Sequence, residues 1–217
     1  MKTKLMMMAM AAGMGMSALG GVYTSGTLSA PIPDNDPNGY VNTISVSGLE
    51  GLTSLSVQLN VSGGYNGDLY AYLTYNGNTV VLLNRVGTGG GNVFGYNNPG
   101  FNITLSDSGS FDVHNYQANG GQTSGALTGT WAPDSSGGVT FGNTYYDGVN
   151  GNGVNVGNGN GTWALFFADL SPGGQSTLDS WSITAVPEPV TMALGVFGCM
   201  ALALGVGRYY AGRQKAA

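Results

Sequence analysis

The stretch LSVQLNVSGGYNGDLYAYLTYNGNTVVLLN, residues 55–84, decides the fold. From residue 55 to residue 61, Leu and Val alternate with polar residues, and this period of two is typical of a half-buried strand. A Gly-rich turn follows at 63–67, and the later pair Asn76-Gly77 tolerates the positive φ of a type I′ hairpin turn. The stretch therefore predicts successive strands at 55–61, 68–75 and 79–84. The last of these is apolar on both faces, so we expect it at the centre of its sheet.

Similar short patterns continue on both sides of this stretch, from residue 41 to residue 185. We expect further strands at 101–105, 139–141, 162–170 and 178–185, with the last two forming a hairpin around the turn Ser171-Pro172-Gly173-Gly174. Trp163 and Trp181 are expected to face the core. No helical period is found between 41 and 185, while the Gly-Asn-rich segment 148–162 is expected to be a flexible loop. Many short strands with Gly-rich turns predict an all-β fold, an antiparallel β-sandwich of the jelly-roll type.

The charge distribution excludes one class of partner. Only 8% of the 217 residues are charged, and 39 are Gly. Between residues 21 and 185 the sequence has one basic residue, Arg85, and ten acidic residues, a formal charge of −9. A surface of that sign repels phosphate backbones, so we expect no nucleic-acid partner. The same charge is compatible with divalent cations.

The supply of catalytic side chains is small. The one cysteine, Cys199, lies in an apolar segment near the C-terminus, so no disulfide can form within the chain. His114 is the one histidine, which makes a zinc site improbable, and no Gly-x-Ser-x-Gly elbow accompanies it. A Ser–His–Asp arrangement around His114 stays open, but a surface histidine is the simpler interpretation. We therefore expect no enzymatic activity.

The two ends of the chain have the features of an exported protein. Residues 1–20 combine Lys2 and Lys4 with an apolar stretch and small residues before a cleavage site after Gly20, which predicts a signal peptide that enters the Sec translocon. At the other end, Pro187-Glu188-Pro189 precedes an uncharged run at 190–206. As a helix that run spans about 25 Å, near the lower limit for crossing a bilayer. Basic residues then end the chain and are expected to stay in the cytoplasm: Arg208, Arg213 and Lys215.

The order of these C-terminal features resembles the PEP-CTERM sorting signal of Gram-negative bacteria that make exopolysaccharide. The resemblance covers residues 186–217, with the membrane helix at 190–206 and the basic end at 208–217. It implies that an integral-membrane exosortase reads the motif at 187–189 and processes the chain near it. The protein would then pass through the inner membrane transiently and reach the cell surface or the extracellular space. The alternative is an uncut tail anchor.

Residues 41–185 show a second resemblance, to the P domains of proprotein convertases. The order of short motifs carries it: GDLYAYL at 67–73 with NGNT at 76–79, FNITLSDS at 101–108, GALTGTWAPD at 125–134, and GTWAL at 161–165 followed by Asp169 and LDSWSI at 178–183. Membership would imply an eight-stranded jelly-roll-like sandwich that does no chemistry itself. The preceding residues 21–40, rich in Pro, Asp, Asn and Ser, are expected to be a leader loop.

Calcium is the metal that the loop residues favour, since Asp, Asn and Ser oxygens are its ordinary ligands. Asp107 follows one predicted strand and Asp169 ends another. The hypothesis is that these two residues bind structural calcium, as in several P domains. The alternative, equally weighted, is that they are solvated acids capping their own turns.

Two functions remain open from the sequence. The first is a non-catalytic surface or extracellular-matrix protein, sorted by an exosortase, whose sandwich binds polysaccharide or a protein partner. The supply of Tyr and Trp, together with the Asn-rich loops, suits this function. The second is an accessory domain of a secreted hydrolase or protease system, whose catalytic module would have to lie elsewhere.

Overall fold

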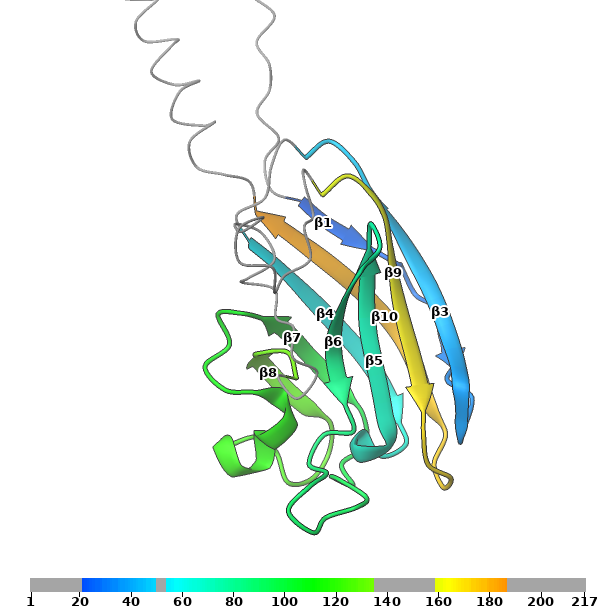
Figure 1. The fold of residues 1–217 in the computed structure, drawn as a ribbon, viewed down its shortest axis with the longest axis vertical. Helices are drawn as coiled ribbons and strands as arrows, with labels where there is room; N and C mark the ends of the chain where they lie inside the picture. Colours follow the sequence, from blue (N-terminus) through cyan, green and yellow to red (C-terminus); the bar gives the residue numbers. More distant parts are fainter. Residues whose placement is uncertain (1–20, 50–53, 135–158, 187–217) are drawn as a thin grey trace, which may run out of the picture. The chain divides into compact units, whose positions relative to one another are not determined.

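The computed structural model describes residues 21–49, 54–134 and 159–186, shown as coloured ribbon in Figure 1. Several predictions fall outside these ranges: the signal peptide, the strand at 139–141 and most of the loop at 148–162. The sorting motif Pro187-Glu188-Pro189, the segment 190–206 and the basic residues Arg208, Arg213 and Lys215 also lie outside them. Within the described residues, no helix is long and apolar enough to cross a membrane.

The strands form two sheets. Sheet A has the order β1-β10-β4-β7-β8, with β2 also paired to β10, and its strands are β1 (Gly21–Thr24), β2 (Ala30–Pro31), β4 (Ser54–Gly63), β7 (Phe101–Ser106), β8 (Leu127–Trp131) and β10 (Ser176–Val186). Sheet B has the order β3-β9-β5-β6, with β3 (Asp36–Val46), β5 (Leu69–Tyr75), β6 (Asn78–Asn84) and β9 (Gly161–Asp169). Apart from the parallel pair β7–β8, every paired strand is antiparallel. The predicted all-β sandwich is confirmed.

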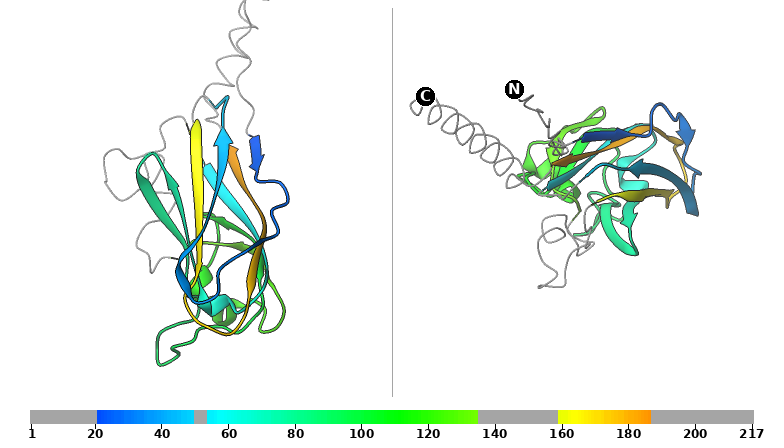
Figure 2. Two further views of the ribbon diagram at one scale, coloured as in Figure 1. Left: turned by 90° about the vertical axis from the view of Figure 1, so that its right-hand side faces the viewer. Right: turned by 90° about the horizontal axis from the view of Figure 1, so that it is seen from above.

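The two sheets form separate layers with the core between them (Figure 2). The alternation in β4 buries Leu55, Val57, Leu59 and Val61, as the period of two predicts. Trp163 projects into the core from sheet B with 2% of its surface exposed, and Trp181 from sheet A with 1%. Both predicted core tryptophans are therefore confirmed, and they come from opposite sheets.

The connection after β9 differs from the prediction. Strand β9 pairs with β3 and β5 in sheet B, while β10 pairs with β1 and β4 in sheet A. Residues 170–175 therefore cross from one sheet to the other, and the predicted hairpin is wrong. The physical reason is that both strands bury a Trp-bearing face. A hairpin would place both faces in one layer, whereas the crossover lets them meet in the core.

Strand β6 is an edge strand rather than the predicted central one. Its register with β5 shifts between Ala71 and Tyr72, so that both Leu82 and Leu83 are buried. The open edge of β6 is covered, since the Asp134 backbone N–H donates to the Leu82 carbonyl over 3.2 Å. Covering an edge protects its unpaired backbone groups. The apolar character of both faces thus reflects this cover and the bulge, not a central position.

Residues 21–40 also differ from the expected leader loop. They include β1, β2 and the first part of β3. Strand β1 pairs with the C-terminal half of β10, from Gly21 opposite Ala185 to Thr24 opposite Ser182. Ile32 is completely buried in the core. The sandwich therefore begins before residue 41.

Several connections gather at one end of the sandwich, the lower end in Figure 1. They are the short 3-10 helix η1 (Asn66–Asp68), the loop from Arg85 to residue 100, the 3-10 helix η2 (Val113–Asn119) and the crossover at 170–175. Hydrogen bonds tie them together: Gly67 N–H donates to the Tyr96 carbonyl over 2.8 Å, and Leu170 N–H to the Asp68 carbonyl over 2.8 Å. We call this region the loop end.

Candidate functional site

A pocket of about 300 Å³ opens at the loop end. Its walls are mostly aromatic and apolar, with a few polar groups among them, which is the usual composition of a small-molecule site. Phe94 is 73% exposed and Tyr65 is 44% exposed. The lining residues are Tyr65, Asp68, Phe94, Gly95, Tyr96, Asn97, Ser171 and Pro172. We call this the end pocket.

Two glycines allow the walls of the end pocket to approach each other. A Cβ on Gly67 would lie 2.3 Å from the Phe94 carbonyl oxygen, and one on Gly95 would lie 2.4 Å from the Val86 carbonyl oxygen. Gly95 also has a φ of 70°, in the left-handed region that favours glycine. Any side chain at either position would push η1 and the 85–100 loop apart.

The loop that carries Phe94 is held in shape by Asn92. Its side-chain amide donates to the carbonyls of Gly87 and Gly95, over 3.0 and 3.1 Å. Its side-chain oxygen accepts from the backbone N–H of Phe94 and of Gly95. The exposed Phe94 ring is therefore presented from an ordered turn, which lowers the entropy that ligand binding would otherwise cost.

Arg85 joins three segments around the end pocket. Its guanidinium donates to the Gly67 carbonyl over 3.3 Å, to the Val93 carbonyl over 3.2 Å and to Ser171 Oγ over 3.0 Å. The Ser171 hydroxyl in turn hydrogen-bonds the Asp68 carboxylate. The Arg85 guanidinium thus contacts Ser171, which lines the pocket, and its hydrogen bonds hold the pocket walls together.

Two buried carboxyl groups lie at the base of this region. Burial raises the pKa of Asp68, although Ser171 and Arg85 oppose the rise. Burial likewise raises the pKa of Asp169 to about 6, and the nearby charges of Asp68 and Asp34 add to the rise. Asp169 Oδ1 accepts from the Ser171 backbone N–H over 3.2 Å, but Oδ2 is buried without a hydrogen-bond partner. Such a carboxylate favours a proton or a cation beside it.

The structure does not bring together the two residues predicted to bind calcium. Asp107 is exposed and follows Ser106, which pairs with Ser56 near the start of β4. Asp169 lies at the other end, beside η1, which follows the end of β4 at Gly63. The seven residue steps from Ser56 to Gly63 span roughly 23 Å of strand. Calcium ligands lie within about 2.6 Å of the ion, so one ion cannot contact both.

Asp169 and Asp68 fit a cation better than Asp169 and Asp107 do, because the orphaned Oδ2 of Asp169 lies near a second buried carboxylate. Across the part of the chain that the structure describes, no group of three or more His, Cys, Asp or Glu could hold a metal. A calcium ion here would therefore need carbonyl, hydroxyl or water oxygens to complete its coordination.

Replacing Asp169 by Asn tests whether the protonated carboxyl group is more stable in this site than the ionised one. The pKa of Asp169 in the folded protein, about 6, lies above its ordinary value of 3.8. The stability that the protonated carboxyl contributes is therefore complete below pH 3.8 and is lost as the pH rises through 6. The pKa of Asp169 is raised by about 2, which corresponds to ~3 kcal/mol at ~1.4 kcal/mol per pKa unit, and solvent screening reduces this amount. In chelator at pH 7.5, we therefore expect Asp169→Asn to raise the free energy of unfolding by about 2 kcal/mol.

In calcium, we expect the wild type to be more stable than Asp169→Asn. An ion that binds the folded state alone raises the melting temperature of the wild type by mass action, while Asp169→Asn should respond little. Asp107→Asn is the matched control, because Asp107 is exposed at the opposite end of the sandwich. Thermal unfolding in calcium and in chelator measures the effect. A wild-type melting temperature that is the same in both would remove calcium from this site.

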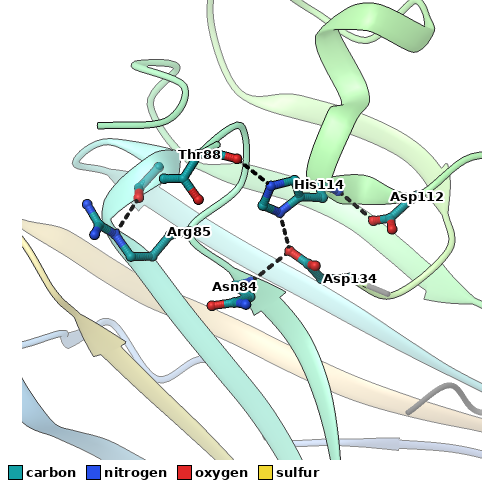
Figure 3. Close-up of polar contacts among 7 residues, drawn as sticks. Asn84, Arg85, Thr88, Asp112, His114 and Asp134 are labelled. Atoms are coloured by element: carbon teal, nitrogen blue, oxygen red, sulfur yellow. Dashed lines mark hydrogen bonds and ion pairs between the residues drawn. The ribbon is translucent and has the colours of Figure 1, made fainter. Parts of the chain in front are cut away.

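His114 lies in a second polar cluster at the loop end (Figure 3). Its Nδ1 is 2.8 Å from Asp134 Oδ2, and its Nε2 is 2.8 Å from the Thr88 carbonyl oxygen. Asp134 is completely buried and also accepts from the Asn84 backbone N–H over 3.0 Å. Asp112, at the N-cap of η2, accepts from the His114 backbone N–H over 2.7 Å. The expectation of a simple surface histidine is therefore wrong.

Both ring nitrogens of His114 face acceptors. A carbonyl oxygen cannot donate, so Nε2 carries the hydrogen that is donated to Thr88. Burial alone lowers the pKa of His114, but the hydrogen bond to Thr88 and then the bond and charge of Asp134 outweigh it, so this pKa lies above 6.5. A nucleophile would need the nitrogen that Thr88 occupies. The cluster therefore pins η2 and the 85–100 loop to the edge of sheet B.

The residues that form the end pocket were not predicted as a site. Tyr65, Phe94 and Tyr96 come from two loops that are about 30 residues apart in the sequence. The sequence feature that could have indicated this site is an aromatic residue inside a Gly-rich segment, as at Phe94 between Gly91 and Gly95. Only the fold shows that these aromatics meet beside Asp68.

No family matches the sequence, and neither does any curated protein. Among solved structures, a serine protease of Aeromonas sobria is similar to 77% of this chain, with 12% sequence identity and a TM-score of 0.40. A complex of an Aeromonas sobria serine protease with its chaperone is similar to 78% of it, with 13% identity and a TM-score of 0.39. The chain spans about a quarter of the length of these matches, 26% and 28%.

Proposed function

We propose that this chain is a non-catalytic exported protein of the cell surface or extracellular matrix, whose sandwich binds polysaccharide through the end pocket. The proposal takes the body as a P-domain-like module, on the order of its motifs. It takes the tail as a sorting signal, on the order of the Pro-Glu-Pro motif, the apolar run and the basic end. Export and the cell surface follow from these two end segments.

The observation that carries the proposal is the composition of the end pocket. Tyr65, Phe94 and Tyr96 supply aromatic faces, which stack against the C–H faces of a sugar ring. Asp68 and Asn97 supply groups that hydrogen-bond sugar hydroxyls. Because Tyr96 packs edge-on against the buried Tyr116, with ring centroids 4.6 Å apart, this wall is rigid before a ligand arrives. A rigid aromatic wall with few polar groups suits a sugar of one or two rings.

The charges around the end pocket select among sugars. Asp68 and Asp169 are buried beside it, and the charge of Asp34 acts on both. Among the residues that the structure describes, the nearby base is Arg85, which is hydrogen-bonded to the pocket walls. A uronic acid would bring its carboxylate toward these acids and be repelled. Neutral sugars are therefore the proposed ligands.

A binding experiment tests the proposal. We expect soluble neutral oligosaccharides to bind the protein, measured by calorimetry, and oxidised uronate oligomers of the same linkage to bind at least tenfold more weakly. Phe94→Ala should weaken binding of the neutral sugars by about tenfold, since a well-placed aromatic contact is worth about 1 kcal/mol or more. Phe111→Ala is the matched control, because Phe111 is also an exposed phenylalanine but does not line the pocket. Equal losses in both variants would reject the end pocket as the site.

Export and sorting have a separate test. If an exosortase processes the tail, protein extracted from the cell surface should lack the residues that follow Pro189. Intact-mass spectrometry measures this directly. A mass that still contains Arg208, Arg213 and Lys215 would exclude processing and favour an uncut tail anchor.

A further inference from the structure

The solvent-facing side of sheet B carries a continuous row of apolar and aromatic side chains. The register places Val41 opposite Phe166, Phe166 opposite Tyr72 and Tyr72 opposite Val81, across all four strands. These strands lie side by side in the order β6, β5, β9, β3 in Figure 1. Tyr70 lies two residues before Tyr72 on the same face of β5. We call Tyr70, Tyr72 and Phe166 the aromatic row.

The rings of the aromatic row hold one another in place. Tyr72 and Phe166 are stacked, with centroids 4.5 Å apart and planes 14° from parallel. Tyr70 contacts both edge-on, at centroid distances of 5.9 and 6.5 Å. Pairs in these geometries contribute stability beyond that of their buried area. The three rings are therefore ordered although none of them is buried in the core.

One end of the row is open to solvent, since Val41 is 56% exposed, whereas Ala168, which lies opposite Tyr70, is completely buried. At Gly39, where φ is 57°, a Cβ would lie 2.8 Å from the Phe166 ring and 2.1 Å from the Phe167 carbonyl oxygen. Only glycine at this position leaves the Phe166 ring where it is.

The face is also uncharged. The next row across the sheet consists of Thr43, Ala164, Thr74 and Thr79. Neither this row nor the row from Val41 to Val81 contains an acid or a base, although residues 21–185 carry a formal charge of −9. Burying charged groups without partners is costly, so a face without them is suited to an uncharged, partly apolar ligand.

We propose that the outer face of sheet B is a second glycan-binding surface, which takes the flat face of an extended, uncharged polysaccharide. Successive sugars of such a chain present their C–H faces, which stack on Tyr70, Tyr72 and Phe166. The hydroxyls of Thr43 and Thr74 lie beside the row and hydrogen-bond the sugar edges. The inference rests on the proposed function in one respect, that the ligand is a glycan. It differs in the site and in the part of the glycan that is bound, which is the flat face of a long chain rather than the one or two rings that the end pocket takes.

The test separates the two sites by the form of the ligand. Binding of the full chain to microcrystalline cellulose and to chitin powder is measured by the loss of protein from solution. Binding to soluble hexasaccharides of the same sugars is measured by calorimetry. We expect Tyr72→Thr and Phe166→Thr to weaken binding to the powders by about tenfold and to leave hexasaccharide binding within about twofold, on the scale of one lost ring contact. Phe94→Ala should weaken hexasaccharide binding. Val22→Thr is the control, because Val22 is 67% exposed on sheet A.

A third face variant shows whether a loss of binding arises from misfolding. Thr43→Lys keeps all three rings but places a charge beside them, so it should reduce binding to the powders while the melting temperature stays unchanged. If the three face variants bind the powders like the wild type, the inference is overturned, and a loss in Phe94→Ala alone leaves the proposed function standing. If the wild type binds neither powder nor hexasaccharide, both are overturned. Dimers of the wild type that become monomers in Tyr72→Thr, with unchanged glycan binding, would make this face a contact between copies and overturn the inference.

Discussion

Replacing Trp163 or Trp181 by Ala is expected to lower the free energy of unfolding by about 3–5 kcal/mol. Trp163 stacks on Tyr75 with ring centroids 4.2 Å apart, and its indole N–H donates to the Gly159 carbonyl over 2.9 Å. Trp181 donates to the side-chain oxygen of Asn42 over 2.8 Å. Each truncation leaves a cavity and an acceptor without its donor. Domains of this size have total stabilities of about 5–15 kcal/mol, so either variant should be weakly folded.

Guanidinium unfolding followed by circular dichroism measures this loss. Val22→Ala is the control, because Val22 is mostly exposed and its truncation should cost less than about 0.5 kcal/mol. Tryptophan fluorescence gives a second readout. Since Trp131 is also largely buried, the wild type should emit at short wavelength and resist an aqueous quencher. An unchanged unfolding midpoint in Trp181→Ala would contradict the packing of β10 against the core.

Removing Asp134 is expected to destabilise the protein by about 3–5 kcal/mol, the usual cost of breaking a buried charge pair from one side. In Asp134→Ala, His114 Nδ1 and the Asn84 backbone N–H both lose their acceptor. Asp107→Ala removes the same charge from an exposed position and serves as the control, with an expected cost below about 1 kcal/mol. Chemical unfolding at pH 6 compares the two. Equal losses of unfolding free energy in Asp134→Ala and Asp107→Ala would show that Asp134 contributes no more to stability than an exposed acid does.

The pair of His114 and Asp134 also makes the free energy of unfolding depend on pH, in a direction that the raised pKa of His114 determines. The pKa of His114 is raised in the folded protein above the ordinary value of 6.5. The contribution of His114 to stability is therefore complete below pH 6.5 and is lost as the pH rises through the raised pKa. Because the chain has one histidine, its ring signals in an NMR titration are unambiguous. A pKa in Asp134→Asn equal to that of the wild type would exclude Asp134 as a cause of the shift.

The strands could be predicted from the sequence because their signal is local. In β4, the alternation of Leu and Val with polar residues fixes which face is buried, whatever the strand pairs with. The predicted strands at 101–105, 162–170 and 178–185 agree with β7, β9 and β10 to within two residues at each end. Trp163 and Trp181 were assigned to the core by the same period.

The partners of the strands could not be predicted in the same way. A short Gly-rich connection suits a hairpin and a crossover equally well, and residues 170–175 are of this kind. What decides between them is the core: Trp163 and Trp181 fill it only from opposite sheets. For the same reason, β6 looks like a central strand in the sequence, although a register shift and the cover from residue 134 account for its two apolar faces.

By itself, the sequence determined the all-β class and the acidic body with its one base, and it predicts export and sorting from the segments at the two ends. Each of these depends on composition or on neighbours along the chain. The tertiary structure decided which residues form the sites. It separated Asp107 from Asp169, placed Asp134 against His114, and brought Tyr65 and Phe94 together over Asp68. It also aligned Tyr72 with Phe166 across two strands. These contacts join residues 20 to about 100 positions apart, and only the register and the packing of two sheets set such distances.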